Sequence, residues 1–380
     1  MNTEDVEFAK KDDEDLAALF LNETSLIDVR APIEFAAGHA PGAVNLPLLD
    51  DEQRAAVGLE YKQRGQGAAV ALGHRLLDGS VRKERLNKWR EYAEKNPQSR
   101  ICCFRGGLRS QLVQSSLRQE HGVSLELIAG GYKRLRGFLL ETLDRLAELE
   151  KFIVVSGFTG AGKTDFLANF HHYCDLEGIA RHRGSAFGRV RDPQPSQANF
   201  ENQLAVSLLK LSTRKVSDPI VIEDESRTIG KCTLPARLFA RMQSAPMIVI
   251  ELPRPERAAN LISTYVTNNY LLRDGDKVDE ANEEKFLLFA NDLNTNLNAI
   301  ETRLGGAEFK TIKAMVAEAI KEHREQGLFA AHIPWVSRLL EKYYDPVYDR
   351  HLQRELKRVV FRGEASEALS KVPLIPIDSH

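Results

Sequence analysis

Short apolar runs alternate along the chain with longer stretches in which apolar residues recur every three or four positions. The short runs have the length and composition of buried strands and lie at 26–30, 43–46, 100–103, 152–155, 219–222 and 247–252. The helical period is found at 52–77, 81–95, 135–150 and 200–211, and it prevails from 255 onward. Strands that alternate with helices predict mostly parallel sheets that bind ligands at the carboxyl ends of their strands.

The run at 152–155 leads directly into a glycine-rich loop that fills the template G-x-x-x-x-G-K-[ST]. A helical pattern begins at Asp165, so the loop has the strand and the helix that a phosphate cradle needs. The glycines let backbone N–H groups turn toward an anion, Lys163 adds a positive charge, and Thr164 can hold a metal on phosphate oxygens. The predicted phosphate-binding residues are Gly157, Gly160, Gly162, Lys163 and Thr164. The motif predicts a polyphosphate or diphosphate and does not specify ATP.

A second chemical centre follows the run at 100–103, where Cys103 begins the loop Cys-Phe-Arg-Gly-Gly-Leu-Arg. Helical sequence follows from Ser110, which we expect at the N-cap. Backbone N–H groups, the helix dipole, Arg105 and Arg109 are predicted to lower the pKa of the Cys103 thiol. The same loop can hold a tetrahedral anion against the nucleophile. The alternative is a buried structural thiol, which is the role predicted for Cys102 on the opposite face of the strand.

Acidic residues end the strand predicted at 219–222, where P-loop proteins place a metal-facing carboxylate. Alternation along the strand puts Glu223 and Glu225 on one face and Asp224 on the other, so we predict Glu223 and Glu225 as the metal-binding pair in the cleft. Arg227 follows closely and is predicted to meet a phosphate.

Two further polar segments carry candidate binding residues. The segment 180–188 predicts Arg183 and Ser185 as substrate-binding residues, with a solvated loop as the alternative. The basic residues Arg354, Lys357, Arg358 and Arg362 predict either a solvated helix face or a contact with an RNA backbone. Asp28, Arg30 and His39 are expected to hold loops together rather than to take part in catalysis.

Composition and net charge add little to these predictions of fold and function. The 380 residues are 28% charged and 43% hydrophobic, which is typical of a soluble globular protein with room for two domains. The net charge of −2 argues against nonspecific binding of polyanions, so any nucleic-acid contact must come from local patches. The acidic N-terminal segment has no apolar signal core, and no predicted segment spans a membrane. The four cysteines match neither a disulfide framework nor a zinc pattern, which favours a cytoplasmic protein.

The first half of the chain resembles a rhodanese domain, a sulfurtransferase fold. The resemblance rests on the Cys103 loop together with Asp28-Val29-Arg30 and Gly38-His39-Ala40-Pro41-Gly42-Ala43-Val44-Asn45. The usual rhodanese loop has four residues between the cysteine and the closing basic residue, whereas five separate Cys103 from Arg109. The wider loop is also found in rhodanese-like phosphatases, so a phosphate-bearing donor would fit it.

A rhodanese domain fused to a P-loop domain is similar to the bacterial tRNA 2-selenouridine synthases. The supporting segments are 103–110, 157–164 and 343–348, and the resemblance extends from about residue 26 to about residue 352. We therefore expect an α/β protein. A rhodanese-like domain at 1–134 would be followed by a connecting helix at 135–150 and by a P-loop NTPase-like domain at 151–380 with a helical C-terminal region.

The resemblance implies a transferase acting on tRNA that carries 2-thiouridine at the wobble position. Selenium from selenophosphate would replace the sulfur, by way of S-geranyl-2-thiouridine formed from geranyl diphosphate. S-alkylation would turn a poor leaving group into a good one. The P-loop would cradle the diphosphate, with Mg²⁺ as a candidate ion and no requirement for ATP. Cys103 would carry selenium as a perselenide or guide its transfer, while Arg105 and Arg109 neutralise the selenophosphate.

Three alternatives differ in their expected behaviour. An ATP-dependent tRNA sulfurtransferase would hydrolyse ATP in the presence of tRNA. A regulatory P-loop switch with a degenerate rhodanese module would have no need of Cys103 and its two arginines. A rhodanese-like phosphatase would release phosphate from an aryl phosphate and would lose this activity on Cys103→Ser substitution.

Overall fold

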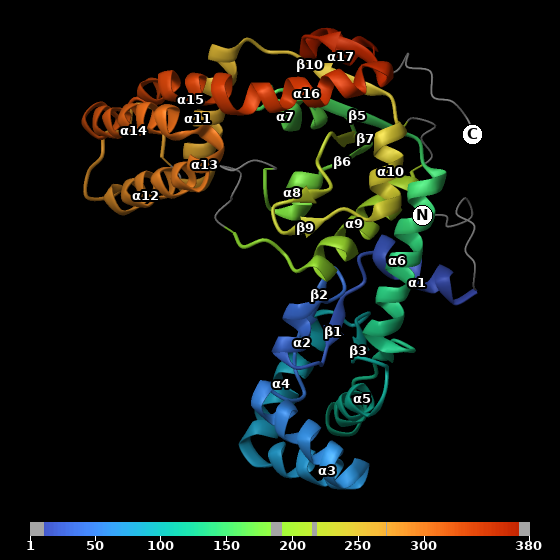
Figure 1. Ribbon diagram of the computed structural model, residues 1–380. Helices are drawn as coiled ribbons and strands as arrows, with labels where there is room; N and C mark the ends of the chain where they lie inside the picture. The colour runs from blue at the N-terminus through green and yellow to red at the C-terminus, as the bar shows by residue number, and fades with distance from the viewer. Residues whose placement is uncertain (1–10, 184–191, 215–218, 271, 372–380) are drawn as a thin grey trace. The chain divides into compact units, whose positions relative to one another are not determined.

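Contacts divide the protein into two compact units, seen in a computed structural model that describes residues 11–183, 192–214, 219–270 and 272–371. The first unit takes the described residues of 1–149 and 195–215, and the second takes those of 150–194 and 216–380. Each unit is built around its own parallel sheet (Figure 1).

The first unit contains a four-stranded sheet in the order β2-β1-β3-β4, with every pair of neighbours parallel. Its strands are β1 (Leu26–Asp28), β2 (Ala43–Asn45), β3 (Arg100–Cys102) and β4 (Glu126–Leu127). The first three confirm the strands predicted from apolar runs. Asp28 lies opposite Cys102 in the register, so the loops that follow β1 and β3 leave the sheet at the same edge.

Helices cover this sheet and bury its apolar side chains, among them Ile27, Trp89, Ile101 and Val113. The helices are α1 (Lys11–Leu21), α2 (Pro32–Ala37), α3 (Asp51–Leu76), α4 (Gly79–Lys95), α5 (Leu108–His121), α6 (Gly131–Leu149) and α9 (Gln197–Ser212). The helical periods at 52–77, 81–95, 135–150 and 200–211 are thus confirmed as helices.

Helix α9 joins the first unit although it follows the phosphate loop in sequence. Asn202 on α9 is buried, and its side-chain amide donates to the backbone carbonyl of His39 at 2.6 Å. The guanidinium of Arg136 on α6 donates to the Asn202 side-chain oxygen at 2.7 Å. Because both side-chain polar atoms of the buried Asn202 have partners, these hydrogen bonds help to fix the position of α9 on α6.

The second unit contains a five-stranded parallel sheet in the order β11-β10-β5-β7-β6. Its strands are β5 (Phe152–Gly157), β6 (Tyr173–Cys174), β7 (Ile220–Glu223), β10 (Met247–Ile250) and β11 (Val359–Gly363). A separate antiparallel pair is formed by β8 (Thr228–Ile229) and β9 (Cys232–Thr233). The central strand β5 places Val155 opposite Glu223 and Gly157 opposite Ile250, so the ends of β5, β7 and β10 meet at one edge.

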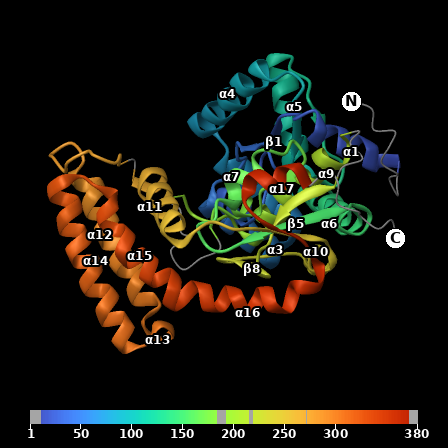
Figure 2. The same cartoon turned by 90° about the horizontal axis from the view of Figure 1, so that it is seen from above.

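The C-terminal part of the second unit is mainly helical, as predicted. Its helices form a group with its own apolar core, and α16 runs from this group toward the sheet (Figure 2). The helices of the unit are α7 (Lys163–Leu167), α8 (Leu176–Ala180), α10 (Ala236–Ser244), α11 (Arg254–Tyr270), α12 (Glu283–Ala299), α13 (Glu301–Leu304), α14 (Gly306–Gln326), η1 (Phe329–His332), α15 (Ile333–Leu339), η2 (Leu340–Tyr344), α16 (Asp345–Glu355), η3 (Leu356–Arg358) and α17 (Ala365–Lys371). Strand β11 interrupts this helical region and was not predicted. Among the described residues no helix is both long and apolar enough to cross a membrane.

Candidate functional site

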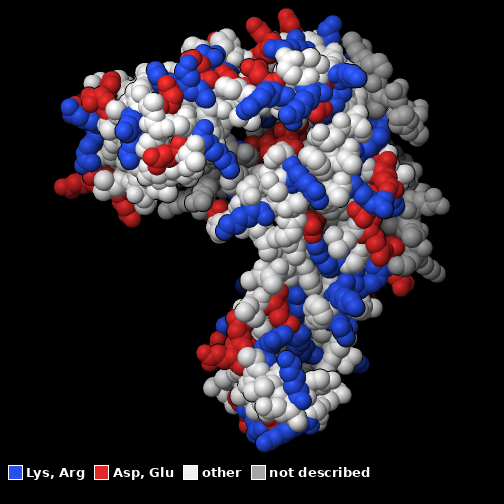
Figure 3. Space-filling view, viewed as in Figure 1, with Lys and Arg blue, Asp and Glu red and all other residues white. Residues whose placement is uncertain are grey.

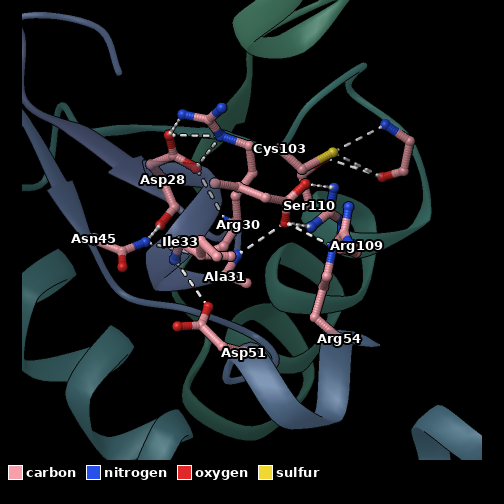
Figure 4. A network of polar contacts seen from close by, with 12 residues as sticks. Asp28, Arg30, Ala31, Ile33, Asn45, Asp51, Arg54, Cys103, Arg109 and Ser110 are labelled. Carbon is pink, nitrogen blue, oxygen red and sulfur yellow. Dashed lines mark hydrogen bonds and ion pairs between the residues drawn. The ribbon is translucent and has the colours of Figure 1, made fainter. Parts of the chain in front are cut away.

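The Cys103 thiol lies at the end of β3, inside a turn formed by the residues that follow it (Figure 4). The N–H of Gly107 donates to Sγ of Cys103 at 3.2 Å, and the Ser110 hydroxyl lies 3.2 Å from the same sulfur. Gly131 closes the turn from behind at a φ of 58°, where an added Cβ would come within 2.2 Å of the Cys103 carbonyl oxygen. Only glycine fits this approach, so the start of α6 helps to shape the loop.

The surroundings of Cys103 favour the thiolate. Burial alone would raise the pKa of the Cys103 thiol. Hydrogen bonds from the Ser110 hydroxyl, and from backbone N–H groups of Ser110, Arg105 and Gly107, outweigh burial and lower this pKa below its usual value. Cys102 has the opposite behaviour, because burial followed by repulsion from Asp28 raises its pKa. Cys102 is 1% exposed, which confirms the prediction that it belongs to the core.

Ser110 does not occupy the predicted N-cap. Helix α5 begins at Leu108 with Gly107 as its N-cap, so Ser110 lies inside the first turn. Its hydroxyl donates to the Gly107 carbonyl at 3.0 Å and faces the sulfur of Cys103. Ser110 is therefore a thiolate-stabilising residue that the capping interpretation missed.

The two arginines of the loop have different surroundings. Arg109 donates to both carboxylate oxygens of Glu34 on α2, at 2.6 and 3.2 Å. This bidentate pair neutralises the guanidinium that we expected beside the sulfur. Arg105 is exposed, and its guanidinium carbon lies 5.9 Å from the centre of the Phe104 ring. The strongest interactions that lower the thiol pKa are hydrogen bonds, not charges on these arginines.

Asp28 and Arg30 hold loops together, as expected, through a fully buried ion pair with a 2.6 Å contact. Arg30 also donates to the Gly38 carbonyl at 2.7 Å and lies 4.0 Å from the centre of the Tyr132 ring. His39 does not join this pair, because its ring stacks on Phe35 at 3.9 Å. The loop after β1 is thereby fixed beside the Cys103 loop.

The predicted phosphate loop connects β5 to α7 in the second unit. Gly160 has a φ of 86°, and a Cβ there would come within 2.6 Å of the Arg257 carbonyl oxygen. Gly162 caps α7 in the left-handed conformation, and Thr164 lies exposed in the first turn. The Lys163 ammonium donates to the Gly157 carbonyl at 3.1 Å. The strand, the loop and the helix start thus have the arrangement that the motif predicts.

Helices of the C-terminal region hold this loop in place. Arg257 on α11 donates to the Thr159 carbonyl at 3.1 Å, and its guanidinium forms a bidentate pair with Asp345 at 3.0 and 2.8 Å. Arg254 donates to the same carboxylate at 3.2 Å. Asp345 is the first residue of α16, so these ion pairs connect the start of that helix to the loop.

A chain of polar groups crosses the edge where β5 and β7 end. Tyr348 on α16 accepts a hydrogen bond from the Gly157 N–H at 2.6 Å, and its hydroxyl contacts the Ser156 hydroxyl. Ser156 donates to Asp224 at 2.5 Å, and His351 lies 3.0 Å from the same carboxylate. Burial raises the pKa of Asp224, but hydrogen bonds from His351 and Ser156 outweigh it and lower the pKa. The predicted alternation is confirmed here, since Asp224 faces this chain and its neighbours face away.

Three glutamates, Glu177, Glu223 and Glu225, lie near Lys163. Glu223 is fully buried and accepts from the Glu177 N–H at 3.0 Å, while its second oxygen is buried without a hydrogen-bond partner. Burial and repulsion within the group raise the pKa values of Glu177, Glu223 and Glu225. Burial lowers the pKa of Lys163, but attraction to Tyr348 and then to these carboxylates raises it overall. Lys163 is therefore a cation at neutral pH.

A cavity of about 1050 Å³ opens beside this loop in the second unit. Its polar lining includes the phosphate loop, Glu177, Asp224 and Glu225. Its apolar lining comes from side chains of α11, α15, η2 and α16, including Leu261, Tyr265, Val336, Leu339, Leu340 and Val347. Figure 3 shows acidic atoms gathered in a hollow below α16, with Lys and Arg side chains around it. The cavity can thus accept a ligand with an anionic end and an apolar end.

The remaining predicted residues are distributed around this cavity. Arg183 and Arg227 both line it, and the Arg183 guanidinium is attracted to Glu177 and Asp165. Ser185 lies outside the described residues. The basic run near the C-terminus is not one solvated helix face, because Arg358 is largely buried and donates to the Met242 carbonyl at 2.7 Å. Of that run only Arg354 lines the cavity.

Glu225 lines the cavity, whereas Glu223 lies beneath its surface. No group of three His, Cys, Asp or Glu side chains suited to a metal occurs in the described part of the chain. Mg²⁺ does not require such a group, since one or two carboxylates and substrate phosphates commonly hold it. The unpartnered buried oxygen of Glu223 fits a nearby cation.

Comparisons with known proteins match both units. A family model described as tRNA 2-selenouridine synthase AAA domain covers residues 150–373, and one described as rhodanese-like domain covers residues 12–137. A protein of Hahella chejuensis named tRNA 2-selenouridine synthase is 44% identical over 94% of this chain and 93% of its own length. Proteins of the same name from Bordetella bronchiseptica and Pseudomonas paraeruginosa are 43% and 44% identical, and the matches cover 95% and 93% of this chain and 97% and 94% of theirs.

Proposed function

The chain belongs to the tRNA 2-selenouridine synthase family, and on that premise we propose that it replaces the sulfur of wobble 2-thiouridine in tRNA with selenium. The proposed selenium donor is selenophosphate, and the proposed intermediate is S-geranyl-2-thiouridine made from geranyl diphosphate. The observation that carries this scheme is a cavity lined both by the phosphate loop and by apolar side chains.

Geranyl diphosphate has the two chemical ends that the cavity can accommodate. We infer that its diphosphate is held by Lys163 and the N–H groups of the loop, because a helix N-terminus and a lysine both favour a bound phosphate. Its terpene chain would lie against the apolar side chains of α11 and α15, where removal of apolar surface from water stabilises the complex. When the sulfur of 2-thiouridine bonds to the first carbon of the geranyl group, the bond from that carbon to the diphosphate oxygen breaks and diphosphate leaves. The N3 proton of the base is released to solvent.

Several residues would assist departure of the diphosphate. Lys163 neutralises charge that develops on the leaving oxygen. Arg183 and Arg227 line the same cavity and supply further positive charge. Glu225 and Thr164 line the same cavity and would hold Mg²⁺, which would add positive charge to the diphosphate oxygens when bound.

Cys103 is the residue we propose for the selenium step. Its thiol has a lowered pKa and lies in a loop of N–H donors, as is expected of a reactive rather than a structural cysteine. Arg105 remains exposed to meet the selenophosphate, whereas Arg109 would have to leave Glu34 to do so. When the selenium of selenophosphate bonds to the C2 carbon of the base, the bond from C2 to sulfur breaks and geranylthiol leaves. Water then cleaves the selenium–phosphorus bond and releases inorganic phosphate.

The test is a mass analysis of nucleosides from tRNA incubated anaerobically with the protein and no nucleotide. Geranyl diphosphate alone should yield S-geranyl-2-thiouridine, and addition of selenophosphate should yield 2-selenouridine. If neither product forms, but ATP and a sulfur donor convert unmodified tRNA, then the protein is an ATP-dependent tRNA sulfurtransferase and the proposal is wrong.

Two variants separate the steps within this assay. Cys103→Ala should block incorporation of selenium while geranylation continues. Lys163→Ala should weaken geranylation first, because it removes the cation beside the diphosphate. Full selenium incorporation by the Cys103→Ala protein would contradict the role assigned to the thiolate.

A further inference from the structure

Tyr348 reaches the phosphate loop from a helix that is almost two hundred residues away in sequence. Its hydroxyl accepts the Gly157 N–H at 2.6 Å, and its ring lies 4.9 Å from that of Phe158. Gly157 is also the residue whose carbonyl accepts from Lys163 at 3.1 Å. The phenol therefore lies at the entrance of the loop, close to the lysine ammonium.

The direction of the hydrogen bonds around Tyr348 follows from the proton count. Ser156 has one hydroxyl proton and gives it to Asp224 at 2.5 Å, so its oxygen is left to accept. Tyr348 must then donate its own proton to Ser156. The phenol oxygen that remains is an acceptor, and it is already bound to the Gly157 N–H.

The position of this acceptor matters because of how phosphate loops distribute a phosphate chain. In P-loop NTPases the lysine spans the β- and γ-phosphates, and the metal between them is held on one side by the acid that ends the neighbouring strand. The γ-phosphate thus lies between the lysine and that acid. Here the acid proposed for the metal is Glu225, which follows β7, and the polar chain from Tyr348 through Ser156 ends on the residue before it, Asp224. The phenol lies at the lysine end of this interval, because it accepts from the Gly157 N–H while Lys163 donates to the Gly157 carbonyl.

Ion pairs to Asp345 hold the start of α16, and with it the phenol, against the loop. Asp345, three residues before Tyr348 on α16, is paired with Arg257, which also donates to the Thr159 carbonyl of the loop. Arg254 adds a third hydrogen bond to the same carboxylate. Movement of Tyr348 out of the loop would require these buried ion pairs to break or α16 to bend.

We propose that Tyr348 makes the cradle selective for a diphosphate by filling the space that a third phosphate would need. A triphosphate would meet a fixed acceptor oxygen in place of the Gly157 N–H, and two acceptors repel each other. The inference rests on the proposed function in taking a diphosphate as the ligand. It adds the residue that would exclude ATP from the same loop.

The test compares inorganic diphosphate with inorganic triphosphate, which differ only in the number of phosphates. Affinities are measured by calorimetry on the full-length protein at fixed Mg²⁺ and ionic strength. Wild-type protein should bind diphosphate at least about tenfold more tightly than triphosphate, a preference of about 1.4 kcal/mol. Tyr348→Ala should reduce this ratio to about one, because it removes the ring and frees the Gly157 N–H.

Two further variants keep the result interpretable. Tyr348→Phe frees the Gly157 N–H but retains the ring, so its ratio of diphosphate to triphosphate affinity should lie between those of the wild type and Tyr348→Ala. This variant replaces Tyr348→Ala in the test if the alanine variant does not fold. Tyr343→Phe is the matched control, since Tyr343 precedes α16 and does not line the cavity, and its ratio should equal that of the wild type. Wild-type protein that binds triphosphate as tightly as diphosphate would overturn the proposal. An unchanged tenfold preference in both Tyr348 variants would overturn it equally.

Geranyl transfer is measured on the same preparations, which separates this inference from the proposed function. A tenfold phosphate preference without geranyl transfer would leave the role of Tyr348 intact and refute geranyl diphosphate as the donor. Geranyl transfer by a protein that binds diphosphate and triphosphate equally would support geranyl diphosphate as the donor and refute the role of Tyr348.

Discussion

Replacing Ser110 by alanine tests whether hydrogen bonds or arginines make the Cys103 thiol acidic. In the thiol form the Ser110 hydroxyl donates to the Gly107 carbonyl at 3.0 Å, and its oxygen can accept from the sulfur 3.2 Å away. In the thiolate form the same hydroxyl can turn and donate to the sulfur. Alanine removes this response to ionisation and leaves the backbone donors and both arginines unchanged.

The expected shift follows from the energy of one hydrogen bond. A hydrogen bond to a charged group contributes about 1.5–3 kcal/mol. Part of this is offset, because the hydroxyl gives up its bond to the Gly107 carbonyl when it turns toward the sulfur. A net stabilisation of about 1.4 kcal/mol corresponds to one pKa unit, so the thiol pKa of Cys103 should rise by about one unit in Ser110→Ala.

The pKa is read from the ultraviolet absorbance of the thiolate during a pH titration, after subtraction of the Cys103→Ala protein. Burial raises the pKa values of Cys102, Cys174 and Cys232, so they contribute little in the relevant range. The control is Ser115→Ala on the exposed side of the same helix, whose hydroxyl donates to the Leu112 carbonyl. A shift below about 0.3 unit in Ser110→Ala would refute the reasoning and point to the arginines.

Two further predictions concern the helical region. Burial lowers the pKa values of His323 and His332 to about 4 and about 3, below the value of 6.5 that a histidine has in the unfolded chain. Their contribution to the free energy of unfolding is therefore complete above pH 6.5 and is lost as the pH falls toward these folded values. Each should contribute about 2 kcal/mol less at pH 5 than at pH 7, and His332→Gln should show a shallower pH dependence of urea unfolding than wild type. Val336→Trp should fill the apolar part of the cavity and reduce geranyl transfer at least about tenfold, a loss of about 1.4 kcal/mol, while calorimetry shows unchanged binding of inorganic diphosphate.

Local sequence patterns predicted the elements that carry the two loops because those patterns act over short distances. The run at 152–155 and the glycine template specify a strand, a turn and a helix start within about fifteen residues. The run at 100–103 and the residues that follow it likewise specify the strand, the loop and the helix start around Cys103. Local patterns also predicted α9 as a helix, but they do not indicate which apolar core a helix joins. The partners of Asn202 lie on α6 and beside α2 and become apparent only in the folded chain.

The residues that sequence reasoning missed act across long separations. Glu34 reaches Arg109 from 75 positions away, and Arg257 reaches Asp345 from 88. No periodicity or spacing relates such pairs, since the chain between them passes through several elements. Strand β11 was missed for a related reason, because its five residues lie in a helical region and alternate in exposure at the edge of the sheet. In the sequence the tyrosine-rich segment 343–348 carries only a family resemblance, whereas its contact with the phosphate loop gives it a physical role.

The two loops stabilise negative charge in different ways, and this difference supports different roles for them. The Cys103 loop directs its N–H groups at a sulfur that the protein itself supplies, and Glu34 neutralises Arg109 beside it. The phosphate loop instead carries the ammonium of Lys163, whose pKa is raised by its surroundings. A sulfur that already has its donors is prepared to react as a nucleophile, whereas a cationic cradle is prepared to receive an anion from solution. The Cys103 loop therefore suits the selenium step, and the phosphate loop suits the geranyl step. With the two steps exchanged, the thiolate would have no substrate to react with and the lysine would have no anion to bind.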